Sequence, residues 1–384
     1  MNRIIAFAFV LNFAVVPAAL AEQADSFSVD LVFPSAPGCE YMRLDMGRLE
    51  DDGLIDMSAN SMAHVPAINQ SSLNICYSAT AAQLVDAWRF SHGDKDYGKV
   101  TSYLAAAIDT GEDPDLVEHY DYDYRFIGGA EFHATIDRRR KDIDWGQMSD
   151  VLDYLAKGRA CDVRELNKGI GASDQGKLLE DLRSAHAAYI LWQLASAVGN
   201  QLGLGKYVID GAVKQRVAEG AAMCMKNIGY GADQIPQISD LVKLLDQGNP
   251  MLFVQKEVDA ACKKGRYSPK TPKPQTFVTG TPDGYRKHVD ELFARKNPQP
   301  IGISFCGNIM KEGAGYKSSC WGHAAVLMGR RFNPESNQCE LLVRNSWGPS
   351  CGMYAKDVKC EGNGNFWVSS DLMMKNTRQL TNLE

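Results

Sequence analysis

The sequence predicts an α+β protein, helical in its first part and rich in β-strands in its last third. Apolar residues recur at helical spacing over 76–92, and broader apolar stripes run through 177–199 and 207–228. Beyond Pro300 the period changes to short apolar runs bounded by turn residues, at 301–305, 324–329, 341–344 and 366–369. This order of helices followed by strands indicates two differently built halves.

Residues 1–21 have the pattern of an export signal. Arg3 supplies a positive start, 4–16 is almost wholly apolar, and Ala19-Leu20-Ala21 fits a signal peptidase site. The apolar run is shorter than the roughly 20 residues that span a bilayer. We therefore expect an exported protein, periplasmic or extracellular, that keeps no membrane segment after cleavage.

Other elements are bounded by turn and helix-stop signals. Residues 22–64 contain short β-like runs broken by prolines and predict an irregular lead-in, and the acidic, tyrosine-rich stretch 111–125 predicts an exposed loop. Short helices are expected over 239–247, which ends before Gly248-Asn249-Pro250, and over 284–296.

Charge and cysteine content exclude several classes of function. The chain has 41 basic and 47 acidic residues, a net charge of −6, whereas nucleic-acid binding needs a concentrated basic surface. Ten cysteines in an exported chain predict disulfides, with Cys306–Cys320 the most economical pair and a second bridge between two of Cys339, Cys351 and Cys360. The chain contains neither a Cys-x-x-Cys pair nor a His-Glu-x-x-His motif, so we expect no metal and no cofactor.

Cys76 is the candidate nucleophile. It begins the predicted helix 76–92, where the positive end of the helix dipole favours a thiolate over a thiol. Gln70, six residues upstream, can fold back so that its side-chain amide and the N–H of Cys76 form an oxyanion hole. Taken alone, this cysteine is more simply explained as a buried structural residue or as half of a disulfide, because buried inert cysteine is the common case.

Two later motifs supply partners for a reactive thiol. His323 enters an apolar strand in Gly322-His323-Ala324, and an imidazole beside a thiol activates the sulfur. Asn345, in Asn345-Ser346-Trp347-Gly348, can accept a hydrogen bond from the histidine ring and fix its tautomer. Trp347 can shield that bond from water. The three motifs in this order predict a Cys76-His323-Asn345 triad.

These motifs resemble the papain family of cysteine peptidases, the cathepsin group. Gln70 and Cys76 resemble the family's oxyanion glutamine and nucleophile in spacing, and the segment 345–348 reproduces its most distinctive tetrapeptide. Residues 297–303 resemble its passage from helix to strand. The resemblance implies a two-subdomain fold, with a helical half and an antiparallel β-barrel-like half, and it covers about 65–95 and 285–370.

The chain also departs from the family pattern. Leu73-Asn74-Ile75 precedes Cys76 where the family has Cys-Gly-Ser, so the usual disulfide at that point is absent and the loop must be braced differently. The gap from Cys76 to His323 exceeds the family's roughly 130–150 residues, which implies an inserted helical region. The expected organisation is a signal, a lead-in, a helical subdomain, a helical insertion and a β-rich subdomain, at 1–21, 22–64, 65–127, 128–235 and 236–384.

The implied function is a secreted or periplasmic cysteine endopeptidase that acts on peptides or proteins through a thioester. Two alternatives stay open at this stage. The chain could be a catalytically inactive papain-like module that binds peptides or partners, because a fold alone does not decide function. It could also be a cysteine acyltransferase or amidase that uses the same three residues.

Overall fold

The structure is a computed structural model with a helical part and a part rich in β-strands. The residues described are 36, 38–49, 55–56, 60–70, 73–110, 120–125, 131–136, 146–170, 215, 218–219, 222, 237–246, 258–315 and 320–384. The predicted signal 1–21, the apolar stripe 177–199 and most of the stripe 207–228 lie outside these residues.

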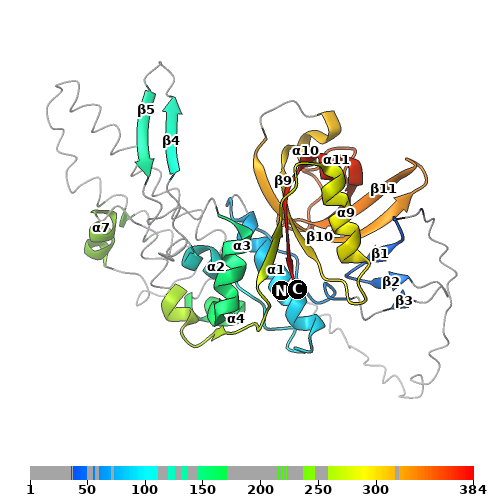
Figure 1. Ribbon diagram of the computed structural model, residues 1–384. Helices are drawn as coiled ribbons and strands as arrows, with labels where there is room; N and C mark the ends of the chain where they lie inside the picture. The colour runs from blue at the N-terminus through cyan, green and yellow to red at the C-terminus, as the bar shows by residue number, and fades with distance from the viewer. Residues whose placement is uncertain are drawn as a thin grey trace, which may run out of the picture.

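The helices of the first half gather beside the sheet (Figure 1). They are α1 (Cys76–Ser91), α2 (Tyr103–Thr110), α3 (Met148–Tyr154) and α4 (Val163–Ile170), with a π-helical turn at Leu155–Arg159. Helix α7 (Ile238–Asp246) lies apart from them, at the left of Figure 1. The short strands β6 (Ala160–Cys161) and β7 (Arg266–Tyr267) pair with each other. Helix α3 falls within the range expected for the insertion, and it packs against α1 and α2 in the same core.

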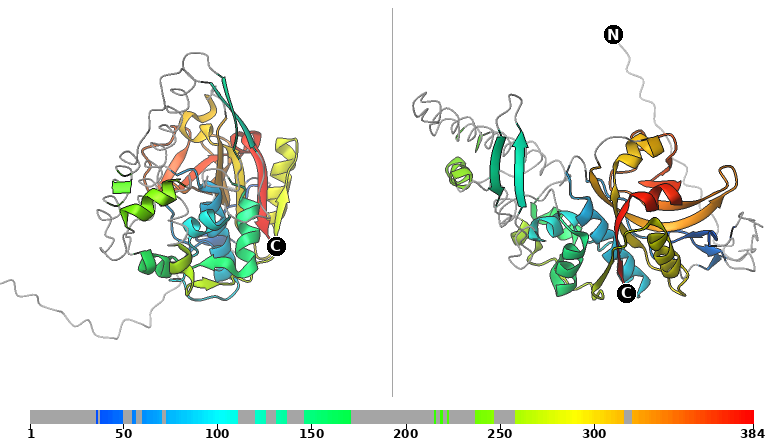
Figure 2. Two further views of the ribbon diagram at one scale, coloured as in Figure 1. Left: turned by 90° about the vertical axis from the view of Figure 1, so that its left-hand side faces the viewer. Right: turned by 45° about the horizontal axis from the view of Figure 1, so that its top comes forward.

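The β-rich half is an antiparallel sheet. Its ladders join β8, β14, β9, β10, β11, β13 and β12 in that order, and β1, β2 and β3 extend from the far end of β10. The strands are β1 (Met42–Arg43), β2 (Gly47–Leu49), β3 (Ile55–Asp56), β8 (Pro274–Phe277), β9 (Ile301–Cys306), β10 (Gly322–Asn333), β11 (Gln338–Arg344), β12 (Lys359–Gly362), β13 (Asn365–Ser369) and β14 (Thr377–Leu383). Three helices, α9 (Pro282–Phe293), α10 (Asn308–Glu312) and α11 (Ser370–Asn376), accompany it, as Figure 2 shows from two further sides.

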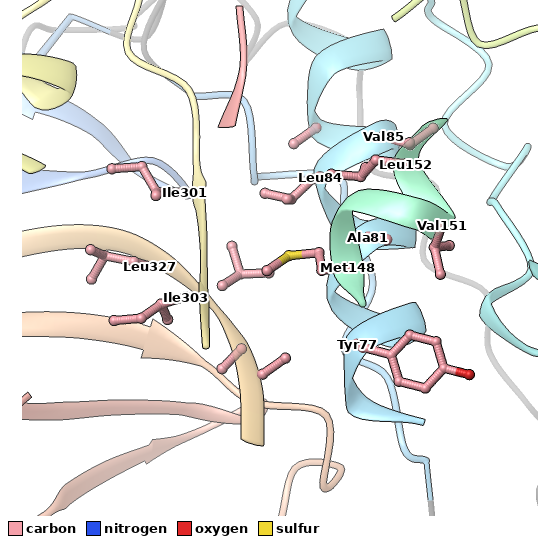
Figure 3. Packing of buried hydrophobic residues seen from close by; sticks show 14 of the residues in the cluster. Tyr77, Ala81, Leu84, Val85, Met148, Val151, Leu152, Ile301, Ile303 and Leu327 are labelled. Atoms are coloured by element: carbon pink, nitrogen blue, oxygen red, sulfur yellow. The ribbon is translucent and has the colours of Figure 1, made fainter. Parts of the chain in front are cut away.

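The two halves share one hydrophobic core, and α1 lies at its centre. Most of α1 is buried, because the helix contacts α2 and α3 on one side and β9, β10 and β14 on the other. Met148 of α3 lies beside Leu84 of α1 and points toward β9, whose Ile301 and Ile303 side chains lie on the other face of the strand (Figure 3). Gly302 permits this approach, since a Cβ atom there would lie 2.2 Å from the Met148 sulfur.

Most predicted elements within the described residues are confirmed. The helix expected over 76–92 is α1, and the late strands are β9, β10, β11 and β13, with a hairpin joining β10 to β11. The loop predicted over 111–125 is wrong for Tyr120–Arg125, which form β4 and pair with β5 (Glu131–Ile136). Alternating tyrosines have a strong strand preference that the acidic composition concealed. The lead-in also contributes strands β1 to β3 to the sheet.

Four disulfides hold the described residues together. Cys306–Cys320 is present as predicted, and the second predicted bridge is Cys351–Cys360. Cys39–Cys339 ties the lead-in to β11, and Cys161–Cys262 ties β6 to a helical segment before β7. Cys76 is free, and Cys224 lies outside the described residues. Such bridges fit an oxidising compartment. None of the described helices combines the length and apolarity needed to cross a membrane.

A buried carboxylate network fixes the far end of α1. Asp86 accepts hydrogen bonds from the Thr101 hydroxyl at 2.6 Å and from Arg89 Nη1 at 2.8 Å. The Tyr267 hydroxyl lies 2.7 Å from Thr101 Oγ1 and 3.1 Å from Arg89 Nη1. Burial raises the pKa of Asp86 to about 6, and the contacts with Thr101 and Arg89 only partly oppose that rise.

We therefore expect the protein to lose stability between pH 4 and pH 7 through Asp86. Its folded pKa lies above its unfolded value, so the stabilisation is present below about pH 4 and lost as pH rises through about 6. The expected decrease in the free energy of unfolding between pH 4 and pH 7 is about 2 to 3 kcal/mol. Denaturant titration at pH 4 and at pH 7 measures it. Asp86→Asn should flatten this dependence, whereas Asp371→Asn, at an exposed ion pair with Arg286, should not. An equally steep dependence in Asp86→Asn would contradict the assignment.

Candidate active site

The sulfur of Cys76 lies at the N-terminus of α1. Ile75, the residue before the helix, provides no side-chain cap. Burial raises the pKa of the Cys76 thiol, while the backbone N–H groups of Ala324, Tyr77 and Cys76 lower it. Ala324 directly follows His323, so this contact places the thiol against the histidine strand.

His323 is held in β10 with one ring nitrogen engaged. Its Nε2 lies 2.7 Å from Asn345 Oδ1, which leaves Nδ1 as the nitrogen that can exchange a proton with another group. Three aromatic rings surround the imidazole, with centroids 5.5 Å away for Phe305, 5.4 Å for Trp321 and 5.2 Å for Trp347.

The pKa of His323 is lowered to about 4. Burial is the main cause, and Lys311 adds a smaller electrostatic contribution in the same direction. The hydrogen bond to Asn345 opposes both effects. Because burial also raises the pKa of Cys76, each group taken separately favours its neutral form. The two groups together can therefore hold one proton over a wide range of pH.

Asn345 is fully buried just after β11, and every polar atom of its side chain is used. Oδ1 also accepts a hydrogen bond from the Ser346 N–H at 2.8 Å, and Nδ2 donates to the Tyr354 hydroxyl at 3.0 Å. The amide therefore cannot turn its nitrogen toward His323 without losing the bond to Tyr354. Tyr354 stacks against Trp347, with ring centroids 5.8 Å apart, so both aromatic residues position the pair.

Gln70 is buried and bound to the segment that carries Asn345. Its N–H donates to the Ser346 carbonyl at 2.8 Å, and its Oε1 accepts a hydrogen bond from the Ser346 hydroxyl. Its Nε2 donates to the Leu73 carbonyl at 2.5 Å, which leaves the second N–H of that amide for another acceptor. These bonds brace the loop before Cys76, where the sequence lacks a disulfide.

A cavity of about 1060 Å³ brings most of the predicted site residues together. Cys76, His323, Gln70 and Trp347 all line it, while Asn345 lies behind His323 and out of contact with the cavity. The cavity is also lined by Gly146, Gln147, Met148, Ser304, Lys311, Trp321 and Arg378. Within the described part of the chain, no three His, Cys, Asp or Glu side chains group closely enough to hold a metal ion.

Several residues of this site are not predicted by the sequence motifs. Trp321 stands two positions before His323, and this nearness of an aromatic residue is the sequence feature that could have indicated a place in the site. Tyr354 and Lys311 carry no sequence signal, because their contacts with Asn345 and His323 depend on the path of the loop after β11 and on α10.

The thiol comes from the helical half and the imidazole from the antiparallel sheet, and the two halves meet at the cavity. The fold is papain-like. This agrees with the fold that the sequence motifs predicted.

The chain is similar to several solved protein structures. No family model and no curated protein matches the chain. A digestive procathepsin L2 proteinase from the larval midgut of Tenebrio molitor is 12% identical with a TM-score of 0.39, covering 84% of this chain and 65% of its own. A structure from work on the mite allergens Blo t 1 and Der p 1 is 11% identical with a TM-score of 0.42, and the match covers 92% of this chain and 73% of that one. SERA5E from Plasmodium falciparum is 12% identical with a TM-score of 0.38, and the match covers 90% of this chain and 95% of that one. The chain thus spans about two thirds of the procathepsin.

Removing the Ser346 hydroxyl should destabilise the site. In Ser346→Ala the buried Oε1 of Gln70 loses its donor, which should cost about 1–3 kcal/mol in free energy of unfolding. Denaturant titration measures this cost. Ser350→Ala, at an exposed serine of the same loop, is the matched control and should stay within about 0.5 kcal/mol of the unsubstituted protein. Equal stabilities of the two variants would contradict the proposed bracing.

Proposed function

We propose that this chain is an exported cysteine endopeptidase that hydrolyses peptide bonds through Cys76, His323 and Asn345. The observation that carries the proposal is the shared cavity. It brings a free thiol at a helix N-terminus together with an imidazole whose other nitrogen is bound to a buried asparagine. A thiol, an imidazole and an orienting amide form the group needed for acyl transfer by a cysteine nucleophile.

In the proposed first step, the thiol proton of Cys76 moves to Nδ1 of His323. The sulfur then attacks the carbonyl carbon of the peptide, and the electron pair of the C=O bond moves onto oxygen. The second N–H of the Gln70 amide and the N–H of Cys76 stabilise this oxyanion. The Asn345 Oδ1 bond to Nε2 keeps the ring oriented while it carries two protons.

In the second step, the imidazolium gives its proton to the leaving amine as the C–N bond breaks, and a thioester on Cys76 remains. His323 next removes a proton from water, whose oxygen attacks the thioester carbon. The proton returns to the sulfur as the C–S bond breaks and the acid product leaves. Trp321 and Trp347 limit the access of bulk water to the imidazole.

The proposal includes export through residues 1–21. The four disulfides support it, because such bridges persist in oxidising compartments. A peptide or a protein segment is the substrate class that the cavity volume and the thiol chemistry accommodate.

The test is hydrolysis of a mixed peptide library by the purified protein, with products identified by mass spectrometry. Cys76→Ala and His323→Ala should abolish hydrolysis. Gln70→Ala should lower kcat by about 10²- to 10³-fold, because one oxyanion donor is lost. Gln275→Ala, on the exposed edge of β8, removes a glutamine outside the cavity and should have no effect.

Hydrolysis that persists in Cys76→Ala would overturn the proposal. Transfer of an acyl group to an added amine without any hydrolysis would favour the acyltransferase alternative. Binding of peptides by the unsubstituted protein without turnover would favour an inactive module.

A further inference from the structure

The charged residues on the cavity wall are all of one sign. Lys311 and Arg378 line the cavity, and the described lining residues include neither an aspartate nor a glutamate. The whole chain carries a net charge of −6, so this positive wall runs against the overall balance. Both side chains are exposed to the cavity and solvent.

Arg378 has no carboxylate partner among the described residues. Other arginines, such as Arg89, Arg266 and Arg330, each form ion pairs with aspartates. Arg378 instead donates from Nη2 to the disulfide sulfur of Cys320 at 2.8 Å, and sulfur is a weak acceptor. Most donors of its planar guanidinium are therefore left for a ligand.

Lys311 lies against the aromatic residues of the same cavity wall. Its Nζ lies 5.4 Å from the ring centroid of Trp347 and 5.9 Å from that of Trp321. These rings hold the ammonium near His323 without neutralising its charge, and no described carboxylate pairs with it. Arg378 thus contacts Cys320 and Lys311 lies near Trp321, the two residues directly before the strand that carries His323.

Strand pairing places Arg378 close to the reacting groups. Thr377 of β14 stands opposite Phe305 of β9, and Phe305 stands opposite His323 of β10. Neighbouring strands are about 4.8 Å apart, so Thr377 lies about 10 Å from His323 across the sheet. A peptide extended along the cavity can span this distance with about three residues.

We propose that the cavity selects peptides that present a carboxylate to Arg378 and Lys311, from an acidic side chain or from a free C-terminus. The proposal rests on the proposed function for its catalytic consequence. A carboxylate matches the guanidinium fork and adds charge to each hydrogen bond. A carboxylate paired with Lys311 also offsets that residue's lowering of the pKa of His323, so a bound acidic substrate favours the imidazolium form.

The test compares matched peptides that are acetylated and amidated and differ at one position, with glutamate, glutamine or lysine there. Each position near the cleaved bond is scanned in turn. For at least one position we expect kcat/KM for glutamate to exceed that for glutamine by about tenfold, which corresponds to about 1.4 kcal/mol, and lysine to be poorest. The glutamine peptide with a free C-terminus shows whether the terminal carboxylate is the preferred source.

Charge variants assign the preference to the wall. Arg378→Gln or Lys311→Gln should bring the glutamate-to-glutamine ratio toward one, and Arg378→Lys should restore part of it. Lys359→Gln, at an exposed lysine on β12 outside the cavity, should leave the ratio unchanged. A ratio near one at every position, with no gain from the free C-terminus, would overturn the inference while leaving the proposed peptidase intact.

Equilibrium binding separates the two proposals. In Cys76→Ala, which cannot form a thioester, the favoured carboxylate peptide should bind about tenfold more tightly than its glutamine counterpart, as measured by fluorescence anisotropy. If the unsubstituted protein hydrolyses no peptide, this binding preference in Cys76→Ala would sustain the inference while the peptidase is refuted. Equal binding of both peptides would refute the inference.

Discussion

The packing of α1 against β9 and β10 is the constraint on which the candidate site depends. The free thiol begins α1 and the imidazole stands in β10, so their relative position is decided by how closely helix and sheet approach. Gly302 and Met148 set that approach, because the glycine leaves room for the methionine side chain between the two layers. At the other end of α1, Asp86 and Arg89 fix the helix to the loop at Thr101.

The electrostatics of the site follow from the same packing. Burial raises the pKa of Cys76 and lowers that of His323, so neither group ionises readily alone. Transfer of a proton from one to the other creates opposite charges that stabilise each other in a poorly hydrated place. The N–H groups at the start of α1 favour the sulfur anion, and Asn345 favours the imidazolium. The thiol and the imidazole can thus both be neutral in the resting protein and form an ion pair when the proton moves from sulfur to nitrogen.

Much of this arrangement was predictable from short motifs. The apolar residues after Cys76 recur at helical spacing, which places Cys76 at the start of a helix. The apolar run after His323 places that residue in a strand. Local sequence carries no such signal for contacts made across the fold. The Ser346 hydroxyl and Gln70, which form a hydrogen bond, lie 276 residues apart, and the cysteines of the Cys39–Cys339 bridge lie 300 residues apart. The bond between Tyr354 and Asn345 depends likewise on the path of the loop after β11. The strand at Tyr120–Arg125 differs from the predicted loop because alternating tyrosines favour an extended backbone despite the acidic composition.

The most direct test of a shared proton is the rate at which iodoacetamide alkylates Cys76 between pH 4 and pH 9, with disulfides intact and sites mapped by mass spectrometry. Below about pH 4 the imidazole takes up a second proton, and above the raised pKa of the thiol the shared proton is lost. The account predicts a nearly constant rate from about pH 5 to 8. In His323→Ala the rate should instead rise about tenfold per pH unit below about 8.5, as for an ordinary thiol. That same steep rise in the unsubstituted protein would contradict the account.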